Sequence, residues 1–336
     1  MRIGLAGAGR IGARHAAALC ALPEVDSLLI ADADADRART VAARLPPDAR
    51  AAPLDTVEEL FTAGLDGVII AAATDAHADL VTRAVAAGVP VFCEKPLASD
   101  VDGTFHVVAA AAAASVPVQV GFQRRFDAGN AAAREVVASG RLGWLHTVRS
   151  CSFDPAPPPA EYIPTSGGLF RDCVIHDLDL IRFVTGREVV RVTAAGANRG
   201  DDFFREYGDV DTGSALLVLD DGTLGVVSAT RYNAAGYDSR LELFGSKDSI
   251  VAGQNDRTPI TALPEKDDGP RNSYSGFMER FAAAYDAELR AFVDMVAGRS
   301  GNPCPPEDAL EAFYLAEACE LSFREGRAVN TEELRR

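Results

Sequence analysis

The sequence predicts two domains: a doubly wound α/β domain on a parallel sheet, then an α+β domain on an open, mainly antiparallel sheet. Three observations support this. Short apolar strands alternate with helices over the first third of the chain, a glycine-rich turn follows the first strand, and later strands follow one another without helices between them. The 336 residues are enough for two such domains. We place them at residues 1–121 and 122–336.

The first domain opens with a dinucleotide-binding pattern. The apolar strand Ile3–Ala6 runs into Gly7-Ala8-Gly9-Arg10-Ile11-Gly12 and an alanine-rich helix. A second strand, Leu28–Ala31, ends at Asp32. This order of strand, glycine turn, helix and distant acidic residue is the Rossmann fingerprint, in which the glycines let a pyrophosphate approach the helix N-terminus. A glycine turn without a ligand is the alternative interpretation.

The acidic residue favours NAD over NADP. Asp32 would accept hydrogen bonds from the ribose hydroxyls and repel a 2′-phosphate, although Arg37 and Arg39 keep NADP binding open. His77 follows the next strand and either contacts the cofactor or only caps its own helix. The predicted cofactor-binding residues are Gly7, Gly9, Arg10, Ile11, Gly12, Asp32, Ala72, Thr74, His77, Glu94 and Lys95.

A lysine stands where a parallel sheet places its ligands. Further strands are predicted at 67–72, 89–93 and 116–121, and Glu94-Lys95-Pro96 directly follows the second of these. Lys95 would then lie at the carboxyl edge of the sheet, beside any nicotinamide, and could stabilise negative charge on a reacting oxygen. The alternative is an ordinary lysine in an exposed loop.

A helix over residues 167–183 combines two stripes. One face is apolar, and the other carries Asp172, His176 and Asp179 at i, i+4 and i+7. A carboxylate one turn from an imidazole can fix its tautomer and stabilise its cation, as a proton-abstracting histidine requires. A solvated polar face is the alternative. The apolar stripe consists of Val174, Leu178 and Ile181, with Ile175 beside it.

The rest of the chain reads as strands and turns. Asp220-Asp221-Gly222 separates two apolar runs and predicts a hairpin. Since no helices intervene among the later strands, we expect an antiparallel sheet with one face on the 167–183 helix. The proline-rich segment 154–159 predicts a rigid wall of a substrate pocket, or alternatively a proline-rich binding motif. The strands are expected at 145–153, 189–197, 214–219, 223–230 and 240–244.

Composition excludes several classes of protein. The net charge of −16 would repel nucleic acid and anionic membranes, and no apolar run approaches the ~18 residues of a membrane span. Six scattered cysteines fit free thiols in a reducing cytoplasm. The first residues enter a strand directly, leaving no room for a signal peptide. A zinc-dependent alcohol dehydrogenase is disfavoured, because Cys93, Cys173 and His176 form no recognisable ligand set.

Four motifs together resemble the Gfo/Idh/MocA oxidoreductases. They are the glycine turn, Glu94-Lys95-Pro96, Gly121-Phe122-Gln123-Arg124-Arg125-Phe126, and the helix with Asp172 and His176. The resemblance spans essentially the whole chain, and within the family it is similar to the inositol dehydrogenases. It implies that Lys95, Asp172 and His176 are the catalytic group. It also implies that the open face of the second sheet pairs subunits into dimers or tetramers.

The expected function is NAD-dependent oxidation of a cyclic polyol, myo-inositol to its 2-keto product, by hydride transfer to the nicotinamide. Another inositol isomer or an aldose is the alternative within this class. A non-catalytic NAD-binding regulator is the alternative of another class, disfavoured by retention of all three catalytic residues. The final helix is expected to pack either in its own domain or back on the first. The predicted substrate-binding residues are Arg124, Asp154, Asp179 and Tyr237, of which Tyr237 rests on the resemblance.

Overall fold

The computed structural model describes residues 1–47, 49–261, 263 and 272–335. The chain forms two compact units. The first unit consists of Met1–Gln123 and Tyr285–Leu310, and the second consists of 124–284 and the residues from Glu311 onward. The chain therefore leaves the first unit close to the expected boundary between 121 and 122. It then returns to that unit for part of its C-terminal third, which the sequence did not predict.

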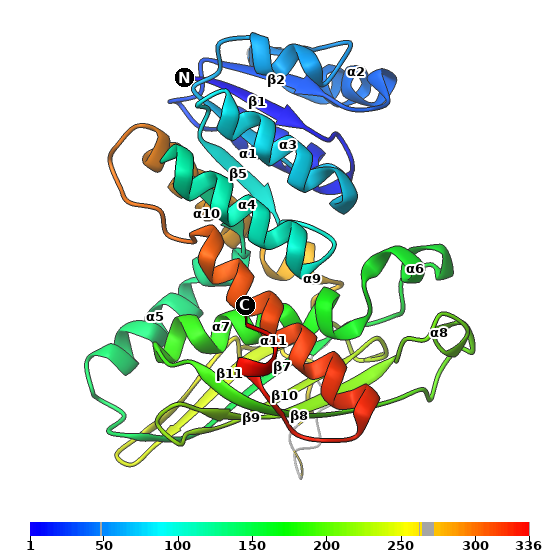
Figure 1. Cartoon of the computed structure of the whole chain (residues 1–336), viewed down its shortest axis with the longest axis vertical. Helices are drawn as coiled ribbons and strands as arrows, with labels where there is room; N and C mark the ends of the chain where they lie inside the picture. The colour runs from blue at the N-terminus through cyan, green and yellow to red at the C-terminus, as the bar shows by residue number, and fades with distance from the viewer. Residues whose placement is uncertain (48, 262, 264–271, 336) are drawn as a thin grey trace. The chain divides into compact units, whose positions relative to one another are not determined.

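The first unit is a six-stranded parallel sheet in the order β3-β2-β1-β4-β5-β6, with helices between its strands (Figure 1). This is the order of a doubly wound dinucleotide fold, and the predicted fold class is confirmed. The elements are β1 (Arg2–Ala6), α1 (Arg10–Cys20), β2 (Ser27–Ala31), α2 (Ala35–Arg44), β3 (Ala51–Pro53), η1 (Glu58–Thr62), β4 (Gly67–Ile70), α3 (Thr74–Ala86), β5 (Val91–Glu94), α4 (Val101–Ala114) and β6 (Val118–Gly121).

Burial on both faces explains why the central strands are almost wholly apolar. All four residues of β4 are buried, as is expected of parallel strands covered by helices on both sides. The helix α10 (Ala282–Val296) contributes Leu289, Phe292 and Val293 to the same core. Aspartate caps start two of the helices, since Asp34 accepts from Asp36 N and Asp100 from Gly103 N. The first unit therefore contains helices whose starts are marked by nearby aspartates, and its core includes a helix from much later in the chain.

The second unit is built on a seven-stranded sheet in the order β12-β11-β7-β10-β9-β8-β13. Its helices α5 and α7 contact each other, and α7 also contacts β7 and β10 (Figure 1). The strands are β7 (Leu145–Phe153), β8 (Val189–Ala197), β9 (Thr212–Leu219), β10 (Leu224–Thr230), β11 (Asp238–Gly245), β12 (Ser249–Ala252) and β13 (Val329–Asn330). The helical segments are η2 (Gln123–Phe126), α5 (Ala128–Ala138), η3 (Ala160–Tyr162), α6 (Ile163–Ser166), η4 (Phe170–Val174), α7 (Ile175–Thr185), α8 (Phe203–Glu206), α9 (Phe277–Arg280), α11 (Pro306–Glu325) and η5 (Thr331–Glu333).

One pair of strands is parallel in a sheet that was expected to be mainly antiparallel. β7 and β10 are parallel, with Phe153 opposite Thr230, whereas the other pairs of this sheet are antiparallel. Parallel neighbours need a long crossover. The helix α7 and the strands β8 and β9 supply it, because they lie between β7 and β10 in the chain. The sheet is therefore mainly antiparallel, and its parallel pair brings two strand ends to one edge.

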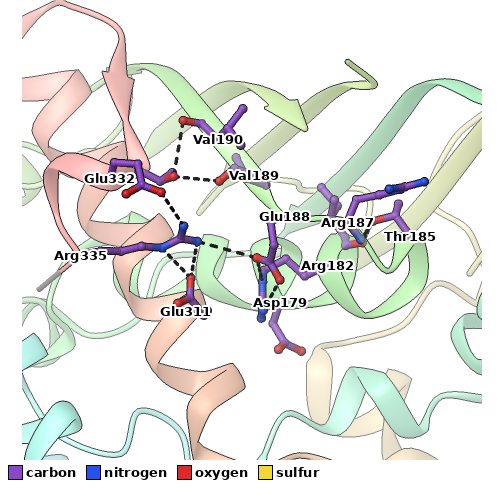
Figure 2. A network of polar contacts seen from close by, with 12 residues as sticks. Asp179, Arg182, Thr185, Arg187, Glu188, Val189, Val190, Glu311, Glu332 and Arg335 are labelled. Atoms are coloured by element: carbon purple, nitrogen blue, oxygen red, sulfur yellow. Dashed lines mark hydrogen bonds and ion pairs between the residues drawn. The ribbon is translucent and has the colours of Figure 1, made fainter. Parts of the chain in front are cut away.

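The final helix belongs mostly to the second unit. From Glu311 onward, α11 lies in that unit, where Glu317 pairs with Arg171 and Ser322 accepts a hydrogen bond from Ala194 N at 2.9 Å. The segment that follows α11 is held by ion pairs (Figure 2). In it, Arg335 contacts Glu311 at 2.7 Å and Glu188 at 4.0 Å. Pro306–Leu310 of this helix belong to the first unit and the rest of it belongs to the second, and packing of the helix on the first domain stays a prediction.

No helix within the described ranges is both long enough and apolar enough to cross a membrane.

Candidate active site

The three glycines of the first turn serve different purposes. A Cβ on Gly7, whose φ is +100°, would lie 2.5 Å from the Ala71 carbonyl, and a Cβ on Gly12 would lie 1.9 Å from the Gly7 oxygen. These two glycines are required by close backbone packing. A Cβ on Gly9 would meet nothing within 4 Å. Gly9 therefore leaves open the space at the N-terminus of α1 where a pyrophosphate is expected to bind.

A hollow of about 270 Å³ lies at this turn and fits part of a dinucleotide. Six of the predicted cofactor-binding residues line it: Gly7, Gly9, Arg10, Ile11, Asp32 and Ala72. Its other lining residues are Arg37, Ala71 and Ala73. The donor groups of the glycine turn and the carboxylate of Asp32 suit a diphosphate and a ribose, so the hollow is chemically matched to NAD.

Asp32 is held rigidly in this hollow. Its Oδ2 accepts from Ala8 N at 2.7 Å, and its Oδ1 accepts from Asp34 N at 2.9 Å and from Arg37 Nη1 at 3.3 Å. The residue is only 6% exposed. A carboxylate has about four acceptor sites, so Asp32 keeps capacity for ribose hydroxyls. Arg37 lies on the same wall, as the NADP alternative requires, but it is paired with that carboxylate.

His77 links two loops rather than lining this hollow. Its Nδ1 lies 2.7 Å from the Pro96 carbonyl oxygen and its Nε2 lies 3.1 Å from that of Ala72. The ring is buried in the first turn of α3, which begins at Thr74. His77 therefore connects the loop after β4 to the loop after β5. These two contacts are not those of a helix cap, and a role towards NAD stays a prediction.

Glu94 and Lys95 stand at the carboxyl end of β5, between β4 and β6. Glu94 is the last residue of the strand, and its Oε1 lies 2.6 Å from His15 Nε2. Lys95 is half-buried in the loop that follows. In a doubly wound sheet the ligand binds outside the carboxyl ends of the strands, so Lys95 occupies an edge suited to the reacting part of the cofactor.

The helix that carries His176 is not continuous. Phe170–Val174 forms a π-helical turn, and α7 begins only at Ile175. A π turn bonds to the fifth residue instead of the fourth, so the i, i+4, i+7 stripe expected from Asp172 to Asp179 is interrupted. The prediction of a regular helix is wrong in this turn. His176, 9% exposed, stands in the first turn of α7, directly after a type of irregularity that is frequent at functional sites.

A buried carboxylate fixes α7 on the sheet. Asp177 is fully buried and accepts from Ser150 Oγ and Ser152 Oγ, each at 2.5 Å, and from Arg124 Nη1 at 3.0 Å. The two serines lie two residues apart on β7, so both are on its buried face. The sequence analysis missed this residue. Asp177 lies three residues after Val174 and four before Ile181, which places it on the apolar face of the helix. A charged residue on that face was the signal in the sequence that could have indicated a buried ion pair.

A second missed residue, Arg231, joins two of the predicted carboxylates. It follows β10, and its guanidinium donates to Asp154 at 3.1 Å and to Asp172 at 2.7 Å. Tyr162 Oη donates to the other oxygen of Asp172 at 3.0 Å. Burial raises the pKa of Asp154 although Arg231 opposes the rise, and burial also raises the pKa of Tyr162. Asp154 and Asp172 thus meet on one cation at the edge of the second sheet.

The remaining predicted substrate residues have protein partners. Arg124 also reaches Tyr237 Oη at 3.4 Å, and both residues are 3% exposed. Asp179 is fully buried in a two-bond ion pair with Arg125, at 2.9 and 2.5 Å. The guanidinium of Arg125 stacks on the Phe183 ring. Both carboxyl oxygens of Asp179 therefore have a structural partner in Arg125. A role of Asp179 in binding substrate stays a prediction.

The first unit defines the class of this protein. A doubly wound sheet with a glycine-rich turn after its first strand and an aspartate after its second has the features of an NAD-binding Rossmann domain. Residues 1–122 match the oxidoreductase family described by that NAD-binding fold, and residues 130–251 match the Gfo/Idh/MocA C-terminal domain. The chain belongs to the Gfo/Idh/MocA oxidoreductases, which confirms the predicted family.

Known relatives share nearly the whole length of the chain. The myo-inositol dehydrogenase Hyg17 of Streptomyces leeuwenhoekii is 40% identical over 97% of this chain and 98% of its own. The myo-inositol 2-dehydrogenase of Thermotoga maritima is 37% identical over 99% of both chains. A solved scyllo-inositol dehydrogenase of Lactobacillus casei, with bound NAD(H) and scyllo-inositol, has a TM-score of 0.88 and 30% identity, covering 99% of each chain.

Proposed function

We propose that this oxidoreductase oxidises a ring hydroxyl of an inositol to a ketone with NAD as the oxidant, myo-inositol being the principal substrate. The observation that carries the proposal is the polar cluster at the edge of the second sheet. There Asp154 and Asp172 are fixed by Arg231, beside the turn that presents His176. A fixed set of acceptors and donors suits a substrate with many hydroxyls. The relatives named for inositol oxidation support the choice of ring.

Each catalytic residue has a separate task. His176 takes the proton of the substrate hydroxyl, and Lys95 stabilises the negative charge that develops on that oxygen. Asp172 orients the pair and is itself held by Tyr162 and Arg231. When NAD is bound, its nicotinamide supplies the acceptor for the hydrogen leaving the carbon. The protein therefore contributes orientation and charge stabilisation, while the bound cofactor supplies the redox chemistry.

The charges in this cluster favour a neutral substrate. Two carboxylates surround one guanidinium at the sheet edge, and Asp177 already pairs with Arg124. A phosphorylated or carboxylated sugar would be repelled by these carboxylates, and the guanidinium groups of Arg231 and Arg124 that lie beside them already pair with them. Neutral polyols carry no such penalty, so the cluster favours them over acidic sugars.

We expect kcat/KM for myo-inositol to exceed that for glucose, galactose and open-chain polyols by roughly tenfold or more, about 1.4 kcal/mol. A site built to bind a given set of hydroxyls leaves a polar group unsatisfied when one is missing or misplaced. Initial rates of NAD reduction across inositol isomers and common aldoses provide the measurement. An aldose oxidised at least as efficiently as every inositol isomer would contradict the substrate, even with the mechanism intact.

NAD should bind about tenfold or more tightly than NADP, because the Asp32 carboxylate repels a 2′-phosphate. Asp32→Ala should narrow this gap by removing the carboxylate and releasing Arg37, which lines the same hollow. Titration of both cofactors gives the dissociation constants. Asp79→Ala, which removes an exposed partner of Arg83 on α3, is the control and should leave the ratio unchanged. NADP binding as tight as NAD binding in the unmodified protein would refute the prediction.

We further propose that the chain pairs with copies of itself through the outer face of the second sheet. Apolar side chains there include Leu216, Val218, Leu224 and Val226, and Leu216 and Leu224 are about 46% and 45% exposed. Sedimentation at rising protein concentration separates a dimer or tetramer from a monomer. We also propose a reducing cytoplasm as its location. None of the six cysteines forms a disulfide, which supports this location, and cell fractionation tests it.

A further inference from the structure

Three titratable side chains from distant parts of the chain meet inside the first unit. They are His15 on α1, Glu94 at the end of β5 and Glu288 on α10. One nitrogen or oxygen atom of each lies within 4.8 Å of those of the other two. His15 and Glu288 are fully buried, and His15 Nε2 contacts Glu94 Oε1 at 2.6 Å. We name these three residues the β5-end cluster.

The charges of this cluster do not balance when both carboxyl groups are ionised. Neither carboxyl oxygen of Glu288 has a hydrogen-bond partner among the residues that the structure describes, although both are buried. The charged groups that face Glu288 are Glu94 from β5 and Arg14 from α1. Arg14 also pairs with Asp286 at the surface, at 2.9 Å. The neighbouring Gln119 of β6 is neutral and donates to the Glu288 backbone carbonyl at 2.9 Å.

A second carboxylate in this place would be costly. A buried charge without a partner loses its hydration, and a like charge nearby adds repulsion. Burial accordingly raises the pKa of Glu288 well above its ordinary value, and the charge of Glu94 raises it further while Arg14 opposes. Of the two carboxyl groups, that of Glu94 has the polar partner that a carboxylate needs, because its Oε1 contacts His15 Nε2. The cheapest arrangement is therefore one carboxylate, at Glu94, and one neutral carboxylic acid, at Glu288.

We propose that Glu288 holds a proton at neutral pH and acts as a positioning residue for the Glu94–His15 pair, and through it for Lys95. Lys95 is the residue after Glu94, so a displaced Glu94 would move it. Loss of the Glu288 proton at alkaline pH would add a repelling charge against Glu94. The effect on catalysis rests on the proposed role of Lys95, whereas the protonation itself does not.

Unfolding at different pH values tests the protonation without any substrate. The folded protein keeps the Glu288 proton while the unfolded chain releases it near its ordinary pKa of 4.5. The free energy of unfolding must then fall as the pH rises from 4.5 to the pKa that Glu288 has in the folded protein. The unfolding equilibrium constant of the unmodified full-length chain should therefore rise relative to that of Glu288→Gln, by up to about tenfold per pH unit. Parallel pH profiles of the two proteins would overturn the proposal.

The matched control is Asp294→Asn, on the same helix, because Asp294 forms a half-exposed pair with Arg299. It should follow the pH profile of the unmodified chain. If Glu288→Gln fails to fold, carbon-13 NMR of the unmodified protein with labelled glutamate carboxyls gives the same answer. Because burial also raises the pKa of Glu320, the measurement is repeated in Glu320→Gln, where one glutamate should still titrate well above 4.5; its absence would overturn the assignment. A stoichiometric divalent metal in the purified protein, lost in Glu288→Gln, would also overturn it.

Catalysis supplies the last readout. In the unmodified enzyme kcat/KM should fall at alkaline pH, and Glu288→Gln should weaken that fall relative to its own value at neutral pH. The pH profile, rather than the rate at one pH, separates a positioning role from a merely structural one. An alkaline fall of equal size in both proteins would refute the link to Lys95. If inositols prove not to be substrates, the unfolding and NMR results still decide the protonation.

Discussion

Replacing His176 by alanine should lower kcat by roughly 10²–10⁴-fold, the usual contribution of a positioned general base. The residue stands directly after the π turn, nearly buried, in a unit whose carboxylates are fixed by ion pairs. Loss of the imidazole leaves the substrate hydroxyl without a proton acceptor. Initial rates of NADH formation with saturating myo-inositol and NAD measure the effect. Near-normal turnover would show that His176 is structural.

Lys95→Ala should lower kcat by roughly 10²–10³-fold through loss of charge stabilisation on the same oxygen. Because both residues are proposed to act on one proton transfer, the double variant should lose much less than the product of the single losses. His146→Ala provides the matched control, since His146 is an exposed histidine on β7. Its kcat should match that of the unmodified enzyme. Fully multiplicative losses would argue that the two side chains act independently.

The second large effect concerns stability. Asp179→Ala should lower the free energy of unfolding by about 3–5 kcal/mol, because it leaves the buried Arg125 guanidinium without its counter-charge. Both side chains are at most 5% exposed, so solvent offers little compensation. Urea unfolding followed by circular dichroism measures the change. Replacing both partners, as Arg125→Met with Asp179→Leu, should recover most of the loss, since no unpaired charge remains.

Asp248→Ala serves as the control for this stability measurement. Asp248 pairs with Arg141 at the surface, so its removal should leave unfolding nearly unchanged. The result also decides between two roles for Asp179. If Asp179→Ala unfolds like the unmodified protein but raises KM for inositol strongly, Asp179 binds substrate as the sequence analysis expected. Marked destabilisation would instead assign it to the ion pair with Arg125.

Local sequence patterns were sufficient to predict the first unit as far as Gln123, but not the return of Tyr285–Leu310 to it. Gly12 and Asp32 act through backbone geometry and hydrogen bonds within one βαβ segment, where spacing along the chain determines spacing in the fold. Lys95 could be placed because a fully apolar strand ends just before it. His77 was harder, since its partners are the carbonyls of two separate loops. A helix-start position predicts neither contact.

The arrangement of the second unit was less accessible to the sequence. A π turn leaves no simple periodic signal, so the stripe from Asp172 to Asp179 looked regular. Asp177 was overlooked for a related reason: its partners on β7 and at Arg124 lie 25 to 53 residues away. The pairing of a helix with a particular strand depends on packing, which periodicity along one element does not specify.

The sequence by itself determined the cofactor fold, the family and the three residues proposed for catalysis, because each rests on a short motif whose geometry is local. Only the tertiary structure decided what holds those residues. Arg231 meets Asp154 because β7 and β10 run parallel, which brings their carboxyl ends to one edge of the sheet. An antiparallel pairing would have placed these two residues at opposite edges. The direction of two strands more than seventy residues apart is set by the crossover through α7, and no local pattern encodes it.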